Sequence, residues 1–310
     1  MTTEPPSPTE PAGLVPPAAP VPPAGLAPPA APVPPADPSP SPARPTAPAA
    51  RPTARQFVDR LRAAVGAPDR PTTVDAFLAG DPDQPVSGVA VTWLASLDVL
   101  RRAADAGCDL VLSHETPFYD HGNQRLAALA QAADPALTAK LALVKERGLV
   151  IWQFHDHWHD RRPDGVDAGV LAALGWGPAS DPAVTVPPTT LADLAALVAD
   201  RLAAPTVRYL GDPALIVRRV GWALGFRGFE AVRRQLLADL DAVLIGEGHE
   251  WEVGSYAADL AAAGRPRGLI VLGHLASEQA GLAAAAHWLE GLGLGPPVRF
   301  IPTADPYRPV

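Results

Sequence analysis

Six of the eight histidines lie just past the ends of four apolar, strand-like runs, and each has a carboxylate within a few residues. The four segments are residues 108–117 (CDLVLSHETP), 148–160 (GLVIWQFHDHWHD), 241–252 (DAVLIGEGHEWE) and 267–278 (RGLIVLGHLASE). In open α/β sheets the carboxyl ends of the strands line the ligand crevice, so these side chains are expected to converge. Converging imidazoles and carboxylates predict a metal site.

Two of the segments pair one histidine with one glutamate at a strand end. His274 follows an apolar run and Glu278 falls in the first turn of the next predicted helix, so both can reach one point. Ser277 and Glu278 also suit an ordinary helix start, which is the competing interpretation. His114 and Glu115 offer adjacent nitrogen and oxygen ligands where the chain turns.

The densest cluster spans residues 155–160, with three histidines and two aspartates in six residues. Buried imidazoles and carboxylates need partners, and their position beside tryptophan and phenylalanine favours a site here. The spacing leaves open which of them would bind metal: His155, Asp156, His157, His159 or Asp160. In the third segment, Glu247 and His249 are candidates for proton transfer, for metal binding or for supporting a ligand.

The donor set limits the metal without identifying it. Mixed His, Asp and Glu ligation without cysteine suits zinc, manganese, iron, cobalt or nickel. Five or more candidate ligands exceed what one tetrahedral ion needs, whereas two divalent ions about 3.5–4 Å apart would use the surplus. Because such ions lower the pKa of water from about 15.7 towards 7, the predicted chemistry is hydrolysis at neutral pH.

The elements that would position these residues follow the α/β pattern, in which stretches with helical spacing alternate with short β-rich runs. Helices are predicted at residues 54–65, 96–106, 125–147 with a break near Pro135, 166–174, 191–203, 229–240, 254–263 and 277–289. Strands are predicted at residues 88–92, 109–112, 150–154, 206–209, 218–223, 242–245 and 269–272.

An internal similarity is visible when the body of the chain is divided near residue 180. Each half holds two strands that end in a His/acid cluster, with helices before and after them. We therefore expect an α/β domain at 55–310 with two similar lobes, 55–180 and 181–310, facing a central metal-binding crevice. Chance similarity between ordinary α/β units is the alternative.

A proline-rich tail precedes this domain at residues 1–54, and 20 of the 39 prolines fall before Thr53. Residues 13–24 (GLVPPAAPVPPA) are repeated almost unchanged at 25–36 (GLAPPAAPVPPA). Such a sequence favours extended polyproline II and predicts a disordered tail. It is either a linker or a ligand for a proline-binding partner.

Composition excludes several other classes of protein. The formal net charge is -8 without a basic stripe, which disfavours direct nucleic-acid binding. The single cysteine can form no internal disulfide, and no long apolar run or basic leader occurs. We therefore expect a cytoplasmic protein without a membrane span.

At its strand-end motifs the chain resembles the dinuclear metal centre hexameric protein family, also called Nif-three-like proteins or GTP cyclohydrolase I type 2 homologues. The resemblance covers about residues 74–310. Four motifs of the family have similar segments here. Residues 114–117 are similar to its His-His-Pro, and residues 156–166 to its His-x-x-x-Asp that leads to Pro-Gly-Gly-Val. Residues 246–250 are similar to its Gly-Glu-x-x-His, and residues 273–278 to its Gly-His-x-x-x-Glu. The ending at residues 298–307 (VRFIPTADPY) is similar as well.

The resemblance implies a ligand set, a fold and an assembly. Carried over position by position, the metal ligands fall on His114, Glu115, Asp160, His274 and Glu278, with Glu278 bridging two ions. The implied subunit is a two-lobed α/β protein in a ring-shaped homohexamer. Two positions depart from the family: Glu115 replaces a second histidine, and Asp156 occupies a histidine position. An oxygen donor at Glu115 makes the site harder and more anionic, which favours manganese or iron.

Two functions from different classes compete. The first is a metal-dependent hydrolase of the GTP cyclohydrolase I type 2-like class, acting on a nucleotide-like or phosphorylated small molecule, with Glu247 and His249 as catalytic proton-transfer residues. The second is a non-catalytic metal-binding regulatory or interaction protein. Since no Walker loop or dinucleotide fingerprint is present, nucleotide binding rests on the resemblance. A degenerate site holding one ion or none is a third possibility.

Overall fold

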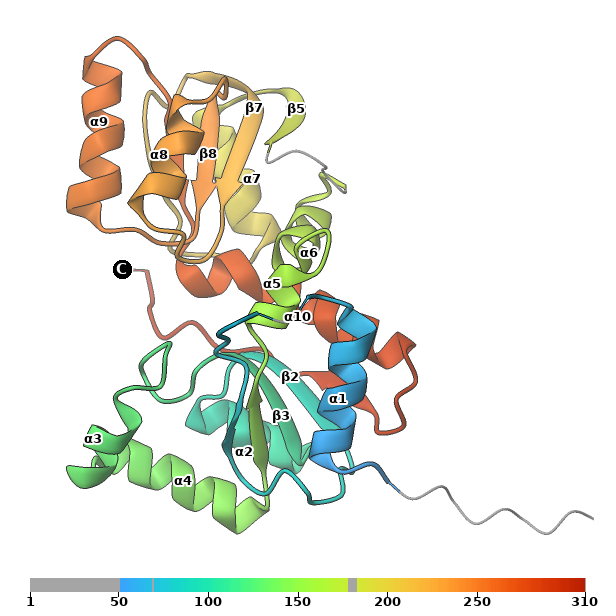
Figure 1. The fold of residues 1–310 in the computed structure, drawn as a ribbon. Coiled ribbons are helices and arrows are strands. Elements are labelled where there is room, and N and C mark those ends of the chain that lie inside the picture. Colours follow the sequence, from blue (N-terminus) through green and yellow to red (C-terminus); the bar gives the residue numbers. More distant parts are fainter. Residues whose placement is uncertain (1–50, 69, 178–182, 310) are drawn as a thin grey trace, which may run out of the picture. The chain divides into compact units, whose positions relative to one another are not determined.

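The computed structural model describes residues 51–68, 70–177 and 183–309, and Figure 1 shows their helices and strands. Residues 1–50, which hold most of the predicted proline-rich tail, lie outside this part of the chain. In the described part, no helix is both long enough and apolar enough to cross a membrane.

The first sheet has the strand order β1-β4-β3-β2-β10. Its strands are β1 (Phe77–Ala79), β2 (Val89–Leu94), β3 (Leu110–Glu115), β4 (Val150–Gln153) and β10 (Val298–Phe300). Strands β10, β2, β3 and β4 run parallel, and β1 pairs with β4 antiparallel at one edge. The carboxyl ends of the parallel strands therefore meet at one end of the sheet.

Helices cover both faces of this sheet because its strands are apolar on both sides, as expected for parallel sheets. Val89 and Val91 of β2 face α1 (Ala54–Val65) in one buried cluster. Ala90, between them, faces the other side, where α2 (Leu97–Asp105) and α4 (Pro135–Arg147) contribute buried residues. The short α3 (Leu126–Gln131) precedes α4.

The second sheet has the order β5-β7-β8-β9-β6. Its strands are β5 (Ala183–Thr190), β6 (Arg208–Leu210), β7 (Ile216–Ala223), β8 (Ala242–Ile245) and β9 (Gly268–Val271). The three central strands are parallel, and antiparallel β5 and β6 form the edges. One face packs against α7 (Leu191–Arg201), and the other packs against α8 (Phe229–Leu237) and α9 (Ser255–Ala262).

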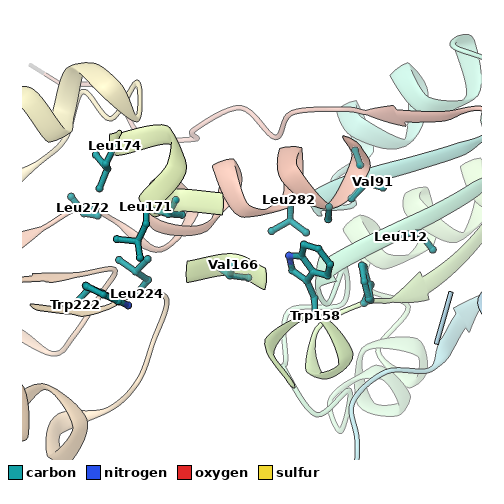
Figure 2. Close-up of a cluster of buried hydrophobic side chains, with 14 of the residues drawn as sticks. Val91, Leu112, Trp158, Val166, Leu171, Leu174, Trp222, Leu224, Leu272 and Leu282 are labelled. Carbon is teal, nitrogen blue, oxygen red and sulfur yellow. The ribbon is translucent and has the colours of Figure 1, made fainter. Parts of the chain in front are cut away.

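Two helices connect the sheets through a shared hydrophobic cluster, drawn in Figure 2. They are α6 (Gly165–Leu174) and α10 (His274–Gly291), which pack against each other. Their backbones approach closely, because a Cβ on Gly169 would lie 2.6 Å from the Cα of Gly281. Trp158 adds its indole to this cluster and donates from Nε1 to the carbonyl of Gly281 at 3.2 Å.

The predicted α/β fold with two similar lobes is confirmed: the structure has two five-stranded sheets, each with a parallel centre and helices on both faces. Five elements were not predicted, namely β1, β5, β10, α5 (Asp156–Asp160) and the π-helical turn η1 (Glu250–Gly254). Three of them are edge strands, which carry weak apolar patterns, and β5 contains two prolines. Strand β10 joins the first sheet although it comes last in the chain. The predicted boundaries at 54/55 and 180/181 stay predictions.

Candidate metal centre

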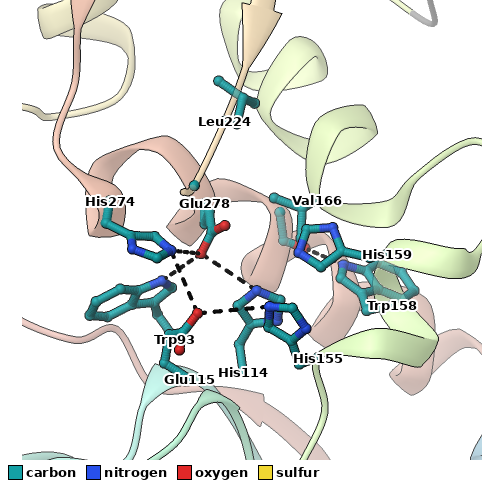
Figure 3. A network of polar contacts seen from close by, with 12 residues as sticks. Trp93, His114, Glu115, His155, Trp158, His159, Val166, Leu224, His274 and Glu278 are labelled. Carbon is teal, nitrogen blue, oxygen red and sulfur yellow. Dashed lines mark hydrogen bonds and ion pairs between the residues drawn. The ribbon is translucent and has the colours of Figure 1, made fainter. Parts of the chain in front are cut away.

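Three parallel strands deliver the predicted ligands to one place. Strand β3 ends with His114 and Glu115, β4 is followed by His155 and α5, and β9 is followed by α10, which starts at His274 and carries Glu278 one turn later. Figure 3 shows these side chains turned toward one another. We call the following six residues the inward cluster: His114, Glu115, His155, His159, His274 and Glu278.

The four histidines of the inward cluster share one orientation. In each ring, Nδ1 faces an oxygen acceptor outside the cluster, which leaves Nε2 for the centre. The acceptors are the Phe154 carbonyl for His114 (3.1 Å), Asp156 for His155 (3.1 Å), Asp164 for His159 (2.9 Å) and Glu247 for His274 (3.5 Å). Metal-bound histidines are held in this way, because the outer acceptor fixes both tautomer and ring orientation.

Two carboxylates face these imidazoles. Glu278 is only 2% exposed, and its Oε2 accepts from Trp93 Nε1 at 2.8 Å and lies 3.1 Å from His274 Nε2. Glu115 Oε1 lies 3.5 Å from the same His274 nitrogen and 3.8 Å from His155 Nε2. Buried carboxylates need a cation or hydrogen-bond donors, and a divalent ion would supply the charge that the protein side chains only partly provide.

An orphaned atom shows that the donor set fits a metal. His114 is fully buried, and its Nε2 makes no hydrogen bond within the described residues. It lies 3.5 Å from Glu278 Oε2, at the centre of the cluster. A buried nitrogen without a partner is costly unless something binds it. The structure offers three overlapping groups whose ligand atoms lie within 4.8 Å of one another: His114, His155 and His159; Glu115, His121 and His155; and His114, Glu115 and Glu278.

The protonation of the cluster points to the same conclusion. Burial alone would raise the pKa of Glu278, but His114 and His274 hold it well below its usual range. Burial alone would likewise lower the pKa of His274, yet hydrogen bonds and charges from Glu247 and Glu278 raise it to about 10. Burial lowers the pKa of His155 to about 4. Without a metal, a proton on His274 therefore balances carboxylates that would otherwise attract a cation.

The second sheet contributes a close backbone approach at Gly225, in the turn after β7. Its φ is +68°, and a Cβ there would lie 2.1 Å from Glu278 Oε1. The Gly225 amide donates to Ser277 Oγ at 2.9 Å, which ties this turn to the start of α10. Only glycine combines this φ with this space, so the turn is shaped around the Glu278 carboxylate.

Asp160, a predicted metal ligand, is not brought to the inward cluster. Its carboxylate pairs with Arg70, whose Nη2 lies 2.6 Å from Oδ1. The reason is that residues 156–160 form the helix α5, in which neighbours point about 100° apart. His155 and His159 are four positions apart and share a face, so they reach the centre while Asp160 points elsewhere.

Asp75 fixes the turn that presents these two histidines. Its fully buried carboxylate accepts from the backbone amides of His155, Asp156 and His157 at 2.8, 2.8 and 2.9 Å. The ring of His157 adds a contact from Nδ1 at 2.6 Å. His155, at the N-cap position, makes no capping hydrogen bond with its own side chain, so Asp75 caps α5 from a distant part of the sequence.

The two predicted catalytic residues lie in different places. Glu247 lines the cavity of the inward cluster, and its Oε1 is 3.5 Å from His274 Nδ1. His249 is 56% exposed, pairs with Glu252 at 3.0 Å and stacks on the indole of Trp251. Among the described residues that line the cavity, Phe226 contacts the His249 ring, but His249 itself does not take part.

The cavity over the inward cluster has a volume of about 520 Å³, within the range of small-molecule sites. Several lining residues were not predicted as site residues: Trp93, Thr116, Tyr119, Asp120, Phe226 and Arg227. His121, which was not among the predicted site residues, also lines it and lies 3.5 Å from Glu115 Oε2. The spacing of His155 and His159 was the available signal for their role, since it matches one helical turn.

The fold and the site together indicate a two-lobed α/β protein whose His/Glu groups could hold metal ions. A model of the Duf34/NIF3 (NGG1p interacting factor 3) family matches residues 76–306, so the chain belongs to this family. This result confirms the family resemblance of the strand-end motifs. No curated protein matches the chain at a significant level.

Solved structures with the same fold include three bacterial or archaeal proteins. A Bacillus cereus protein related to NIF3 has a TM-score of 0.66 at 11% identity, covering 84% of this chain and 100% of its own. Staphylococcus aureus protein SA1388 has a TM-score of 0.63 at 15% identity, covering 83% and 99%. Reduced HcgD from Methanocaldococcus jannaschii has a TM-score of 0.54 at 11% identity, covering 81% and 97%. At these identities the likeness establishes the fold alone.

Proposed function

We propose that this protein is a metal-dependent hydrolase of the GTP cyclohydrolase I type 2-like class, acting on a nucleotide-like or phosphorylated small molecule. The observation that carries the proposal is the shared orientation of four imidazoles, each with Nδ1 held from outside and Nε2 left for the centre. Such an arrangement prepares a site for metal before the metal binds.

We propose two divalent ions, held by the inward cluster with His121 as a further candidate ligand. The overlapping groups of donors support more than one ion, since a single tetrahedral ion would leave ligands unused. The nitrogen and oxygen donors suit zinc, manganese, iron, cobalt or nickel. When bound, such ions supply Lewis acidity and acidify water, which is the chemistry of hydrolysis near neutral pH.

The protein residues around the ions have separate tasks. Glu247 lines the cavity beside His274 and is the better placed of the two predicted proton-transfer residues. Trp93 donates to Glu278 and so holds the orientation of that carboxylate. His249 would need a change of position to take part, so its catalytic assignment stays a prediction.

The open cavity supports an enzyme over a non-catalytic metal-binding regulatory protein. Structural metal sites are closed by protein ligands, whereas catalytic sites keep room for water or substrate. A cavity of about 520 Å³ beside the ligand atoms leaves this room. The homohexamer implied by the family resemblance, the cytoplasmic location and a partner for the proline-rich tail stay predictions.

Metal content and turnover test the proposal together. Full-length protein and its His274→Ala/Glu278→Ala variant are measured by plasma mass spectrometry, beside His249→Ala as a control that lies outside the cavity. We expect about two ions per chain in the parent and in the control, and a clear loss in the double variant. The metal-loaded parent should hydrolyse p-nitrophenyl phosphate or a purine nucleoside triphosphate, and Glu247→Gln should reduce turnover while retaining metal. Metal binding without turnover of any such substrate would favour the regulatory alternative.

A further inference from the structure

Arg227 is the one arginine or lysine among the described residues that line the cavity of the inward cluster. The other ionisable lining residues are histidines, carboxylates and Tyr119. A permanent positive charge beside a metal site needs an explanation, because cations in the same cavity repel one another. Either Arg227 serves the protein's own carboxylates, or it meets a negative charge that enters with a ligand.

The loop that carries Arg227 holds its backbone in a defined shape. Gly225 and Gly228 flank it with φ values of +68° and +74°, and the Gly225 amide and carbonyl are bonded to Ser277 and to the Glu247 amide. Arg227 Nε donates to the Leu224 carbonyl of the same loop at 3.0 Å. This contact fixes the plane of the guanidinium relative to the loop.

Only part of the guanidinium is occupied by protein. Nη2 donates to Asp164 Oδ2 at 3.2 Å, and it lies 3.3 Å from His159 Nδ1 and 3.7 Å from Asp167 Oδ1. Nη1 has no hydrogen bond or ion pair within the described residues, and the side chain is 36% exposed. Two N–H donors on Nη1 are therefore available, on a group whose other nitrogens hold it in place.

We propose that Arg227 binds an oxyanion of the substrate, a phosphate group being the best match, and so selects anionic substrates. This inference rests on the proposed function, because Arg227 would contact the ligand that binds in the same cavity. Guanidinium groups recognise phosphate through paired N–H donors. Two divalent ions would balance the four carboxylates that line the cavity, Glu115, Asp120, Glu247 and Glu278, so the charge of Arg227 would remain to attract a negatively charged substrate.

The competing role for Arg227 is support of the metal centre through Asp164. Asp164 accepts from His159 and also from the first amides of α6, so a loss of Arg227 could loosen His159. A structural role of this kind predicts loss of metal from an Arg227 variant. An anion-binding role predicts that metal is retained and anion affinity falls. The two roles are thus separated by measuring both quantities.

The test uses full-length, metal-loaded protein freed of unbound metal, with inorganic phosphate as the probe in isothermal titration calorimetry. Arg227→Gln is compared with Arg227→Lys and with Arg233→Gln, which removes the same charge from an exposed pair with Glu230 on α8. We expect phosphate affinity to fall about tenfold to a hundredfold in Arg227→Gln with metal content unchanged. Arg227→Lys should recover part of the affinity, and Arg233→Gln should stay within about twofold of the parent.

Several results would overturn the proposal. Unchanged phosphate affinity in Arg227→Gln, or no phosphate binding by the parent, would exclude an oxyanion contact. Loss of metal from both Arg227 variants would assign Arg227 to the support of His159. Acetate and phosphate depending equally on Arg227 would leave the oxyanion contact but remove the preference for phosphate. Phosphate binding that depends on Arg227 in a protein without turnover would sink the hydrolase proposal alone, so the two failures are distinguishable.

Discussion

Strands β4 and β8 end in similar sequences but present them differently. Both are short, buried parallel strands, and each is followed within four residues by an acid and a histidine and then by a single helical turn. After β4, His155 and His159 point into the inward cluster and are mostly buried. After β8, His249 and Trp251 are 56% and 73% exposed and stack on each other.

The turn after the strand accounts for the difference. Asp75 gathers the first three amides of the β4 turn on one buried carboxylate, so α5 starts in a fixed orientation. Within the described residues, the His249 side chain makes no capping hydrogen bond to the turn η1 after β8, and its one ion pair is with the nearby Glu252. Residue types at a strand end therefore indicate a possible site, but a distant cap decides which side chains reach it.

The largest effect is expected from the histidines themselves. His155→Ala/His159→Ala removes two inward imidazoles, and we expect loss of at least one bound ion per chain, because the remaining donors cannot complete both coordination shells. His249→Ala should keep the full metal content. Plasma mass spectrometry on both variants makes this comparison. Equal metal loss in the two variants would show that the exposed turn also moves to the centre.

Asp75→Ala should have the second-largest effect. It leaves three buried amides and the His157 ring without their acceptor, which should lower the free energy of unfolding by about 3 kcal/mol. Metal affinity should fall as well, because His155 and His159 lose their fixed orientation. Glu252→Ala, its counterpart on the exposed turn, should cost about 0.5 kcal/mol or less. Urea unfolding measures both changes; similar costs would contradict a special role for the Asp75 cap.

The smallest predicted effect is a pH dependence of stability that differs between the metal-free and the metal-loaded protein. The pKa of His274 is raised from 6.5 to about 10 without metal, so its protonation stabilises the metal-free fold fully below pH 6.5 and less as pH rises toward 10. Metal must displace this proton, so affinity should rise about tenfold per pH unit for each proton released. Thermal unfolding with and without manganese at buffered free concentration should show a metal-induced shift that grows from pH 6.5 to 8.5. A metal-induced shift that shrinks over this pH range would contradict the displacement of the His274 proton by the metal.

The repeating apolar pattern made most of the fold predictable. Central strands such as β3 and β8 are continuous apolar runs, and α1 begins at its predicted residue because Thr53 and Gln56 form a capping box. Two edge strands were missed because β1 has only three residues and β5 contains two prolines, which weaken its strand pattern. Strand β10 was also missed, since its partner β2 lies about 200 residues earlier and no local pattern reports such a pairing.

The sequence predicted most of the residues that could bind metal, but it predicted less well the directions in which their side chains point. Four of the five predicted ligands meet at the centre, because the end of β3 and the first turn of α10 place them there. Asp160 was chosen by alignment to a family motif, which carries no information on how α5 rotates. Arg227 and Trp93 could not be foreseen, because they reach the cavity from segments without any metal-ligand pattern.

The late position of β10 also has a consequence for how the chain is made. Strand β2 is made early, yet its edge partner β10 is synthesised about 200 residues later, and α10 with His274 and Glu278 comes only shortly before β10. At about 5–20 residues per second, the growing chain waits roughly 10–40 s for these pieces. Until then the ribosome holds a polypeptide with four of the six residues of the inward cluster. Metal capture would thus mark the moment at which translation has passed the last helix.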